Sequence, residues 1–328
     1  MSISKFTCKQ AQTVLPVPSG GSLTRNRSNI MIRQKDKVVF VIGPTGTGKS
    51  RLSVELATLF PAEIINSDKI QLYKGLDIVT NKITEEEKCG VPHHLLGIAD
   101  PDSEFTARDY CYEASTAVES IVRRGQVPII VGGSNSYMEA LVDDKNNYFR
   151  TRYDCCFIWV NVHMPILHSF VSERVDQMVC NGMVDEVRNV FNSNANYERG
   201  IRKAIGVPEF DKFFREEAYL DDKTREKLLQ EAITQVKNNT CKLACRQLEK
   251  IQRLRTHKGW RINRIDATEV FIRRTARAQA DEAWETLVAR PSAKIVRDFL
   301  YNFPDVTASY PTIRGMSMEG ALAPAATC

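Results

Sequence analysis

The amino-acid sequence predicts an α/β fold: a P-loop parallel sheet wrapped by helices, with a largely helical C-terminal half. An apolar run at residues 38–42 enters a glycine-rich turn, and a helical pattern leaves it. Short apolar runs then alternate with helical patterns as far as about residue 162, and helical spacing dominates beyond that point. In folds of this kind ligands bind at the carboxyl ends of the strands, so functional side chains are expected at that edge of the sheet.

The glycine-rich turn has the spacing of a phosphate-binding loop. Residues 43–50, GPTGTGKS, fit the pattern G-x-x-x-x-G-K-[ST] between a strand and a helix. Backbone N–H groups of such a loop converge on an anion, Lys49 adds a positive charge and Ser50 can ligate Mg²⁺. The motif leaves open whether the phosphates belong to ATP, to a substrate or to a leaving group. The predicted phosphate-binding residues are Gly43, Pro44, Thr45, Gly46, Thr47, Gly48, Lys49 and Ser50.

The remaining elements follow in chain order. A β-branched run predicts a second strand, and the segment VPIIVGG predicts a third strand that ends in a Gly-Gly turn and opens a helix at Ser134. The expected elements are 62–66 (strand), 67–82 (polar loop), 106–124 (helix), 127–133 (strand and turn), 155–162 (strand), 224–255 (long helix) and 261–268 (short strand).

The chain divides into four predicted parts. They are a leader (1–37), a P-loop α/β core (38–164), a helical portion that completes the active site (165–270), and a C-terminal helix with a disordered tail (271–328). The net charge of +5 is uneven, because the leader carries +6 and the rest of the chain −1. A basic, acid-poor, hydroxyl-rich leader predicts an organelle transit peptide, with a disordered tail as the alternative. We therefore expect a plastid location, with the cytoplasm as the alternative.

The composition is that of a globular protein, with 43% hydrophobic and 26% charged residues in 328. No apolar stretch approaches transmembrane length, so no membrane partner is expected. The nine cysteines lack paired metal spacing, which favours a reduced compartment, and Cys328 does not sit where a prenylation signal requires it. His93 and His94 are interpreted as hydrogen-bonded loop residues. Cys241 and Cys245, four residues apart on a predicted helix, are interpreted as core residues because no histidine is near them in the sequence.

Asp68 is the acidic residue near a predicted strand end. P-loop ATPases and GTPases normally hold Mg²⁺ with a further Asp at the end of a neighbouring apolar strand, and that Asp is not evident in this sequence. Asp68 could be a general base, a metal ligand or a helix cap. Its loop, residues 67–82, carries more polar groups than a turn requires and follows a strand end, which favours a functional role.

Basic residues in the helical half form a second candidate group. Arg202 and Lys203 follow Gly200 in GIRKAIG. Many such cations only face solvent. A site that binds both a diphosphate and nucleotide phosphates nevertheless needs several cations from outside the P-loop, because one lysine cannot offset their charge. The segment CKLACRQLEKIQRL places four more on overlapping helical faces: Lys242, Arg246, Lys250 and Arg253.

Seven segments together resemble the isopentenyltransferase family and, within it, the plant adenylate isopentenyltransferases of cytokinin synthesis. In family order, from residue 43 to about residue 256, they are GPTGTGKS, IINSDKIQLYKGLDIVTNK, VPHHLLG, PIIVGGSNSY, RVDQMVCNGMVDEV, GIRKAIGVPEF and LACRQLEKIQRL. The leader and the C-terminal residues carry little that matches.

The resemblance implies transfer of a dimethylallyl group from dimethylallyl diphosphate to the exocyclic amine of ATP, ADP or AMP, with release of diphosphate. The P-loop would then hold the leaving diphosphate, with Lys49 and Thr47 in catalysis, and Asp68 would accept the proton of the amine. Ser50 with Mg²⁺, and Arg202 by its match to GIRKAIG, would stabilise the developing charge. Candidates for holding the acceptor's phosphates are Arg150, Arg152, Lys203 and Lys242.

Three alternatives stay open: a tRNA isopentenyltransferase, a P-loop metabolite kinase, and a nucleotide-binding regulatory module. A free nucleotide is expected rather than tRNA, because the chain after the leader has no net positive charge for gripping RNA. The resemblance adds that tRNA enzymes carry a helical insertion after the Gly-Gly turn, where this chain has only residues 134–154, and that some end in a zinc finger. Past Arg255 only His257 and Cys328 are available as such ligands.

Overall fold

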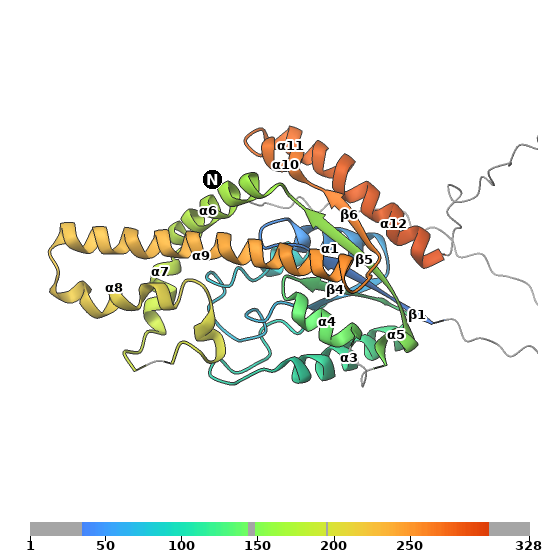
Figure 1. Ribbon diagram of the computed structural model, residues 1–328, viewed down its shortest axis with the longest axis horizontal. Helices are drawn as coiled ribbons and strands as arrows, with labels where there is room; N and C mark the ends of the chain where they lie inside the picture. Colours follow the sequence, from blue (N-terminus) through green and yellow to red (C-terminus); the bar gives the residue numbers. More distant parts are fainter. Residues whose placement is uncertain (1–34, 144–147, 195, 302–328) are drawn as a thin grey trace, which may run out of the picture.

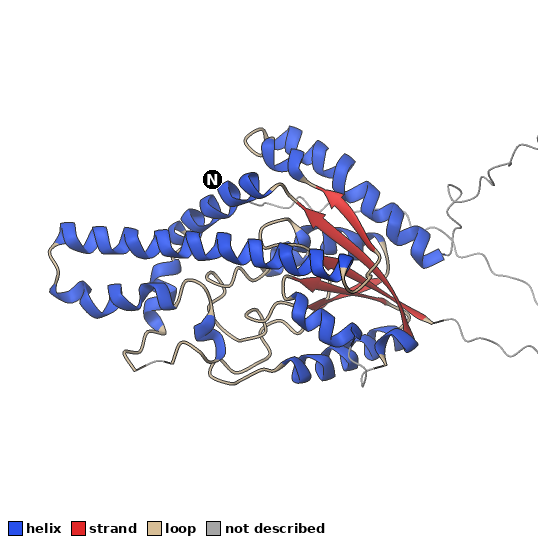
Figure 2. Ribbon diagram, viewed as in Figure 1, coloured by secondary structure: helices blue, strands red, loops and turns tan. Residues whose placement is uncertain are grey.

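The computed structural model describes residues 35–143, 148–194 and 196–301, and the structural statements below concern these residues. Six parallel strands form one sheet in the order β3-β2-β4-β1-β5-β6 (Figure 2). β1 (Asp36–Ile42) lies between β4 (Val127–Gly132) and β5 (Tyr153–Asn161), and β6 (Ile262–Asp266) forms one edge. β2 (Ala62–Asn66) lies between β4 and β3, the strand at the other edge. The predicted parallel sheet and its strands are confirmed.

The segment around the two adjacent histidines differs from the predicted loop. His93 and His94 form β3, a two-residue edge strand that pairs with Ile64 and Ile65 of β2. His94 Nε2 lies 2.6 Å from the carboxylate of Glu63, and His93 Nδ1 lies 2.8 Å from the carbonyl oxygen of Val91. Both imidazoles therefore make structural contacts, as inferred from the sequence, although the backbone there is a strand.

Helices cover both faces of the sheet (Figure 1). Their bounds are α1 (Lys49–Leu59), α2 (Glu85–Lys88), α3 (Ala107–Arg123), α4 (Asn135–Asp143), α5 (Phe149–Arg152), α6 (Met164–Cys180), α7 (Met183–Asn189), α8 (Asp211–Glu216), α9 (Asp222–Thr256), α10 (Thr268–Ile272), α11 (Arg277–Trp284) and α12 (Arg290–Tyr301). One hydrophobic cluster joins the sheet to α1, α6 and α10–α12, and a second joins it to α3, α4 and the end of α9.

Helix α9 connects the body of the protein to a helical projection. Its first turn is capped by Asp221, whose carboxylate accepts the N–H groups of Lys223 and Thr224. The first half of α9 packs with α8 and α7 around a third hydrophobic cluster, away from the sheet (Figure 1). The second half reaches the first two clusters through Ala244 and Ile251. One straight helix thereby fixes the projection relative to the sheet.

The three predicted parts after the leader pack together. The first cluster contains Val39, Val171 and Val296, one from each part, and β6 completes the sheet although it lies in the predicted helical portion. The predicted tail at 302–328 and most of the predicted leader, residues 1–34, lie outside the described residues. Within the described residues, no helix combines the length and apolar character that crossing a membrane requires.

Candidate active site

The P-loop joins β1 to α1 at the carboxyl edge of the sheet. Thr47 Oγ1 and Lys49 Nζ both donate hydrogen bonds to the carbonyl oxygen of Pro44, at 3.0 and 2.6 Å. Gly48 precedes α1 in a left-handed conformation with φ 89° and offers no side-chain cap to the first turn. The N–H groups at the start of α1 are therefore available to an anionic ligand.

Arg174, on α6, contacts the P-loop and was missed in the list of candidate residues. Its Nη2 donates a hydrogen bond of 2.9 Å to Thr45 Oγ1, while its buried Nε has no partner within the described residues. Burial lowers the pKa of Arg174 to about 10, against an opposing effect of the charge of Asp68. A half-buried guanidinium with a buried, unpaired N–H donor indicates an anion site. Arg174 opens the quoted segment RVDQMVCNGMVDEV, which could have revealed it.

Gln247, on α9, links the P-loop to the Gly-Gly turn after β4. Its Oε1 accepts the N–H of Thr45 at 2.7 Å, and its Nε2 donates to the carbonyl oxygen of Gly133 at 3.1 Å. A Cβ atom at Gly133 would lie 2.2 Å from Nε2, so only glycine allows this close approach. The glycine pair predicted to end the strand is thus part of the site's scaffold.

The charge of Asp68 acts on both Lys49 and Arg174. The charge of Asp68 raises the pKa of Lys49, but burial acts more strongly and lowers that pKa to about 8, with a further decrease from Arg174. Asp68 Oδ1 also accepts the N–H of Ile70 at 3.1 Å, so the carboxylate caps a turn, although not a helix. One carboxylate oxygen is held in place by the backbone while the group lies near Lys49 and Arg174.

A cluster of three lysines lies beside Asp68. Desolvation lowers the pKa of Lys69, and the charges of Lys250 and Lys203 lower it further, so both charges act on Lys69. Lys69 Nζ lies 4.7 Å from the ring centre of Tyr137. Lys203 and Lys250 form no ion pair within the described residues. The structure thus brings the predicted Lys203 together with two lysines from other elements.

Two other predicted cations, Arg152 and Arg150, are not brought to the P-loop. Arg152 precedes β5, whose Tyr153 pairs with Asp36 at the amino edge of the sheet, and it is paired with Glu119 at 2.7 Å. Nine strand residues at ~3.3 Å each separate that edge from the P-loop edge. The assignment of Arg152 to phosphate binding is therefore wrong, and the same applies to Arg150, which pairs with Asp143.

The contacts of Arg202 lie with other parts of the protein, and its role in diphosphate binding stays a prediction. Arg202 donates to Asp102 at 3.2 Å and to the carbonyl oxygen of Val190 at 3.2 Å, and none of its contacts in the described chain reaches the P-loop. Lys242 is exposed on α9, and no contact among the described residues ties it to the site. A role for Lys242 stays a prediction.

Magnesium fits the site only together with a bound diphosphate. No group of three or more His, Cys, Asp or Glu side chains suited to a metal occurs within the described chain. The donor available is the hydroxyl of Ser50, exposed in the first turn of α1. Mg²⁺ commonly takes one or two protein oxygens and completes its shell with substrate phosphates and water, so this donor suits it.

Cys241 and Cys245 have a histidine close by, contrary to the sequence-based expectation. Cys245 Sγ lies 3.4 Å from His168 Nε2 on α6, and Cys241 Sγ lies 3.9 Å from the carbonyl oxygen of His168. The three side chains pack between α6 and α9 and, within the described part of the chain, are not arranged as a metal site. Cys241 and Cys245 are still interpreted as packing residues. The reason is their position between two helices, and not the absence of a nearby histidine.

Comparison with known proteins identifies relatives along most of the chain. Residues 71–152 and 143–253 match the family described as IPP transferase. "Adenylate isopentenyltransferase 3, chloroplastic" of Arabidopsis thaliana is 55% identical over 97% of this chain and 97% of its own length. "Adenylate isopentenyltransferase 7, mitochondrial" of the same plant is 52% identical over 92% of this chain and 91% of its length. "Adenylate isopentenyltransferase" of Humulus lupulus is 42% identical over 79% and 89%.

Two solved structures share the fold. A eukaryotic dimethylallyltransferase acting on tRNA superposes with a TM-score of 0.68 at 25% identity, over 82% of this chain and 80% of that one. The full-length tRNA isopentenylpyrophosphate transferase of Bacillus halodurans gives a TM-score of 0.61 at 26% identity, over 77% and 99%. The P-loop sheet with its helical half is thus common to these proteins.

The lowered pKa of Lys49 predicts how diphosphate binding depends on pH. Lys49 carries a charge below about pH 8 and loses it above, so affinity for inorganic diphosphate should fall as the pH rises from 7.5 to 9. A Lys49→Arg variant stays charged over that range, and the ionisation of the ligand itself affects both proteins equally. Calorimetric titration should show the wild-type to variant affinity ratio falling with pH. Parallel profiles would contradict the assignment.

Proposed function

Because the chain belongs to the IPP transferase family, we propose that it transfers the dimethylallyl group of dimethylallyl diphosphate to the exocyclic amine of an adenine nucleotide. The observation that carries this proposal is the meeting of a P-loop, two half-buried cations and one carboxylate at the carboxyl edge of the sheet. Cations suit a leaving diphosphate and the carboxylate suits a proton acceptor. Family membership argues against the alternatives of a kinase and of a regulatory module.

The donor diphosphate would lie in the P-loop. Cleavage of the allylic carbon–oxygen bond moves negative charge onto the diphosphate, and groups that bind the charged product more tightly than the substrate lower the barrier. Lys49 and Arg174 are placed for this, with the N–H groups of the loop and with Thr47, whose hydroxyl orders the turn. Bound Mg²⁺, held by Ser50 and phosphate oxygens, would supply further charge neutralisation.

The acceptor's amine would meet Asp68. The lone pair of an adenine amine is delocalised into the ring, so the amine attacks efficiently only as its proton is removed. Asp68 supplies a carboxylate beside the diphosphate site, with its orientation set by the N–H of Ile70. The new carbon–nitrogen bond forms as the carbon–oxygen bond breaks, the proton passes to Asp68, and diphosphate leaves.

The lysine cluster would hold the acceptor's phosphates. Lys69 is adjacent to Asp68 in the chain, and Lys203 and Lys250 converge on it from a different turn and from α9. These positive charges would hold the acceptor's phosphates, while Lys49 and Arg174 would hold the donor's diphosphate. The cluster supports a nucleotide rather than a nucleoside as the acceptor.

An Asp68→Asn variant tests the general base. The amide keeps the size of the side chain but cannot take a proton, so kcat should fall by ~10²–10⁴-fold with donor binding retained. Asp77→Asn, in the same loop, is the matched control, because Asp77 makes an exposed ion pair with Lys82. Steady-state kinetics with both substrates give the comparison. More than about a tenth of wild-type kcat in Asp68→Asn would contradict this role.

Lys203→Ala and Lys250→Ala variants test the acceptor site. Loss of a hydrogen bond to a charged group costs ~1.5 kcal/mol or more, so KM for ADP or ATP should rise about tenfold with kcat little changed. Adenosine, which lacks phosphates, should be unaffected as an acceptor. Lys237→Ala is the control on α9, the helix that carries Lys250, since Lys237 pairs with Asp176 at 2.6 Å. Equal effects on ADP and adenosine would exclude phosphate binding by the cluster.

A free nucleotide is the acceptor favoured over tRNA. The chain is 55% identical to a protein named for adenylate, and 26% identical to the solved bacterial tRNA enzyme. The argument from a missing helical insertion, where this chain has only residues 134–154, stays a prediction. The support comes from the net charge of −1 after the leader and from the lysine cluster.

Competition between substrates tests this preference. Purified protein is mixed with Mg²⁺, dimethylallyl diphosphate, ADP and unmodified tRNA at equal concentrations of target adenine, and products are separated by mass. ADP should be prenylated preferentially, because its phosphates reach the lysines. Preferential prenylation of tRNA would overturn the acceptor assignment and leave the donor chemistry intact.

Plastid import is proposed for the leader. Relatives carry the words chloroplastic or mitochondrial in their names, and residues 1–37 are basic and acid-poor. A fluorescent fusion of the full chain should enter plastids, and a fusion without residues 1–37 should not. A diffuse cytosolic signal from the full-length fusion would contradict a transit peptide.

A further inference from the structure

The indole ring of Trp284 lies against the P-loop. Trp284 ends α11 and is 2% exposed. A Cβ atom at Gly48 would lie 2.8 Å from the ring carbons Cη2 and Cζ3, closer than nonbonded carbons approach one another. Gly48 is the residue that turns the P-loop into α1. The ring therefore fills the space beside the last glycine of the loop.

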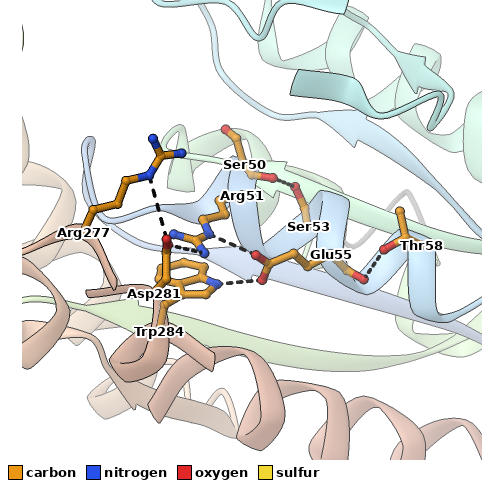
Figure 3. A network of polar contacts seen from close by, with 8 residues as sticks. All are labelled: Ser50, Arg51, Ser53, Glu55, Thr58, Arg277, Asp281 and Trp284. Carbon is orange, nitrogen blue, oxygen red and sulfur yellow. Dashed lines mark hydrogen bonds and ion pairs between the residues drawn. The ribbon is translucent and has the colours of Figure 1, made fainter. Parts of the chain in front are cut away.

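Polar contacts hold this ring in one orientation (Figure 3). The indole N–H donates to Glu55 Oε2 at 2.7 Å, and Glu55 Oε1 accepts from Arg51 Nε at 2.9 Å. Arg51 Nη2 reaches Asp281 at 3.2 Å, and the guanidinium lies 4.5 Å from the centre of the indole ring. Arg51 and Glu55 belong to α1, the helix whose first turn faces the phosphates, and Asp281 belongs to α11. The network thus ties the start of α1 to α11.

The backbone after Trp284 is also unusual. A π-helical turn, Glu285–Ala289, follows α11 directly and leads into α12. Such turns change the direction of the side chains that flank them and are frequent at functional sites. Trp284 and the π-helical turn lie beyond residue 253, where the family match ends, and the P-loop precedes residue 71, where that match begins. The contact between the ring and Gly48 therefore joins two segments outside the family match.

Trp260 is a second buried tryptophan whose surroundings can be compared with those of Trp284. It is 3% exposed, and its N–H donates to Asp143 at 2.9 Å, much as that of Trp284 donates to Glu55. Its ring packs on Phe157 in the cluster on the other face of the sheet. Burial and an indole–carboxylate hydrogen bond are therefore common to both residues, and the contact with the P-loop distinguishes Trp284.

We propose that Trp284 is a positioning residue for the diphosphate site: its ring fixes the backbone at Gly48, so that the N–H groups at the start of α1 point at the leaving group. The inference rests on the proposed use of the P-loop for the donor diphosphate. It assigns to the C-terminal helices a part in donor binding. Trp284 acts through Gly48 and does not touch the substrate.

Calorimetric titrations of the full chain with inorganic diphosphate and, separately, with ADP test the proposal. Trp284→Leu removes the flat ring and should weaken diphosphate binding at least tenfold, with ADP binding at the lysine cluster changed less than twofold. Trp284→Phe keeps a ring against Gly48 and should stay within threefold of the wild type for both ligands. Trp260→Phe is the matched control and should change neither. Thermal melts confirm that each variant is folded.

A fluorescence measurement covers the case in which Trp284→Leu does not fold. A Trp159→Phe, Trp260→Phe variant leaves Trp284 as the single tryptophan, and saturating diphosphate should shift or quench its emission. Unchanged emission would overturn the proposal. In the titrations, diphosphate affinity of Trp284→Leu within twofold of wild type would also overturn it, as would an equal loss of affinity for diphosphate and for ADP. Failure of prenyl transfer in a wild type that binds diphosphate as expected would count against the proposed function alone.

Discussion

The candidate site is built around two cations, Lys49 and Arg174, at the carboxyl edge of the sheet. Their positive charges are destabilised there by desolvation, and the charge of Arg174 also disfavours that of Lys49. Burial lowers the pKa of both, and Asp68 is the carboxylate that opposes this effect for each. Within the described chain the Nε of Arg174 has no partner. An anion with several charged oxygens would stabilise the charged forms of both side chains and raise their pKa values again. The protein side of the site is therefore electrostatically matched to a diphosphate.

Residues distant in sequence assemble around this pair. Arg174 reaches the P-loop from α6, Gln247 from α9 and Trp284 from α11, and each is held by a different part of the fold. Gln247 and Lys250 are three residues apart on α9, so one helix carries a contact to the donor loop and a cation of the acceptor cluster. Helix α9 thus links the P-loop to the lysine cluster.

Features that depend on residues close together in the sequence were predicted correctly. The P-loop, the strands and the place of Asp68 at a strand end follow from short patterns, and the structure agrees. Arg174 and Gln247 were missed because their hydrogen bonds to Thr45 span 129 and 202 residues, so residue spacing alone does not place them at the P-loop. The assignment of Arg152 was wrong because basic character was considered without the direction of the strand. A residue just before a parallel strand lies at the amino edge, away from the ligands.

We propose above all that the P-loop and its half-buried cations stabilise a leaving diphosphate during prenyl transfer. A single-turnover measurement on Lys49→Ala, with dimethylallyl diphosphate, ADP and Mg²⁺ all saturating, isolates the chemical step from binding. The account predicts a rate constant lower than that of the wild type by ~10²-fold or more, since Lys49 acts where charge develops. A rate constant within about threefold of wild type, with weaker donor binding as the sole defect, would contradict it.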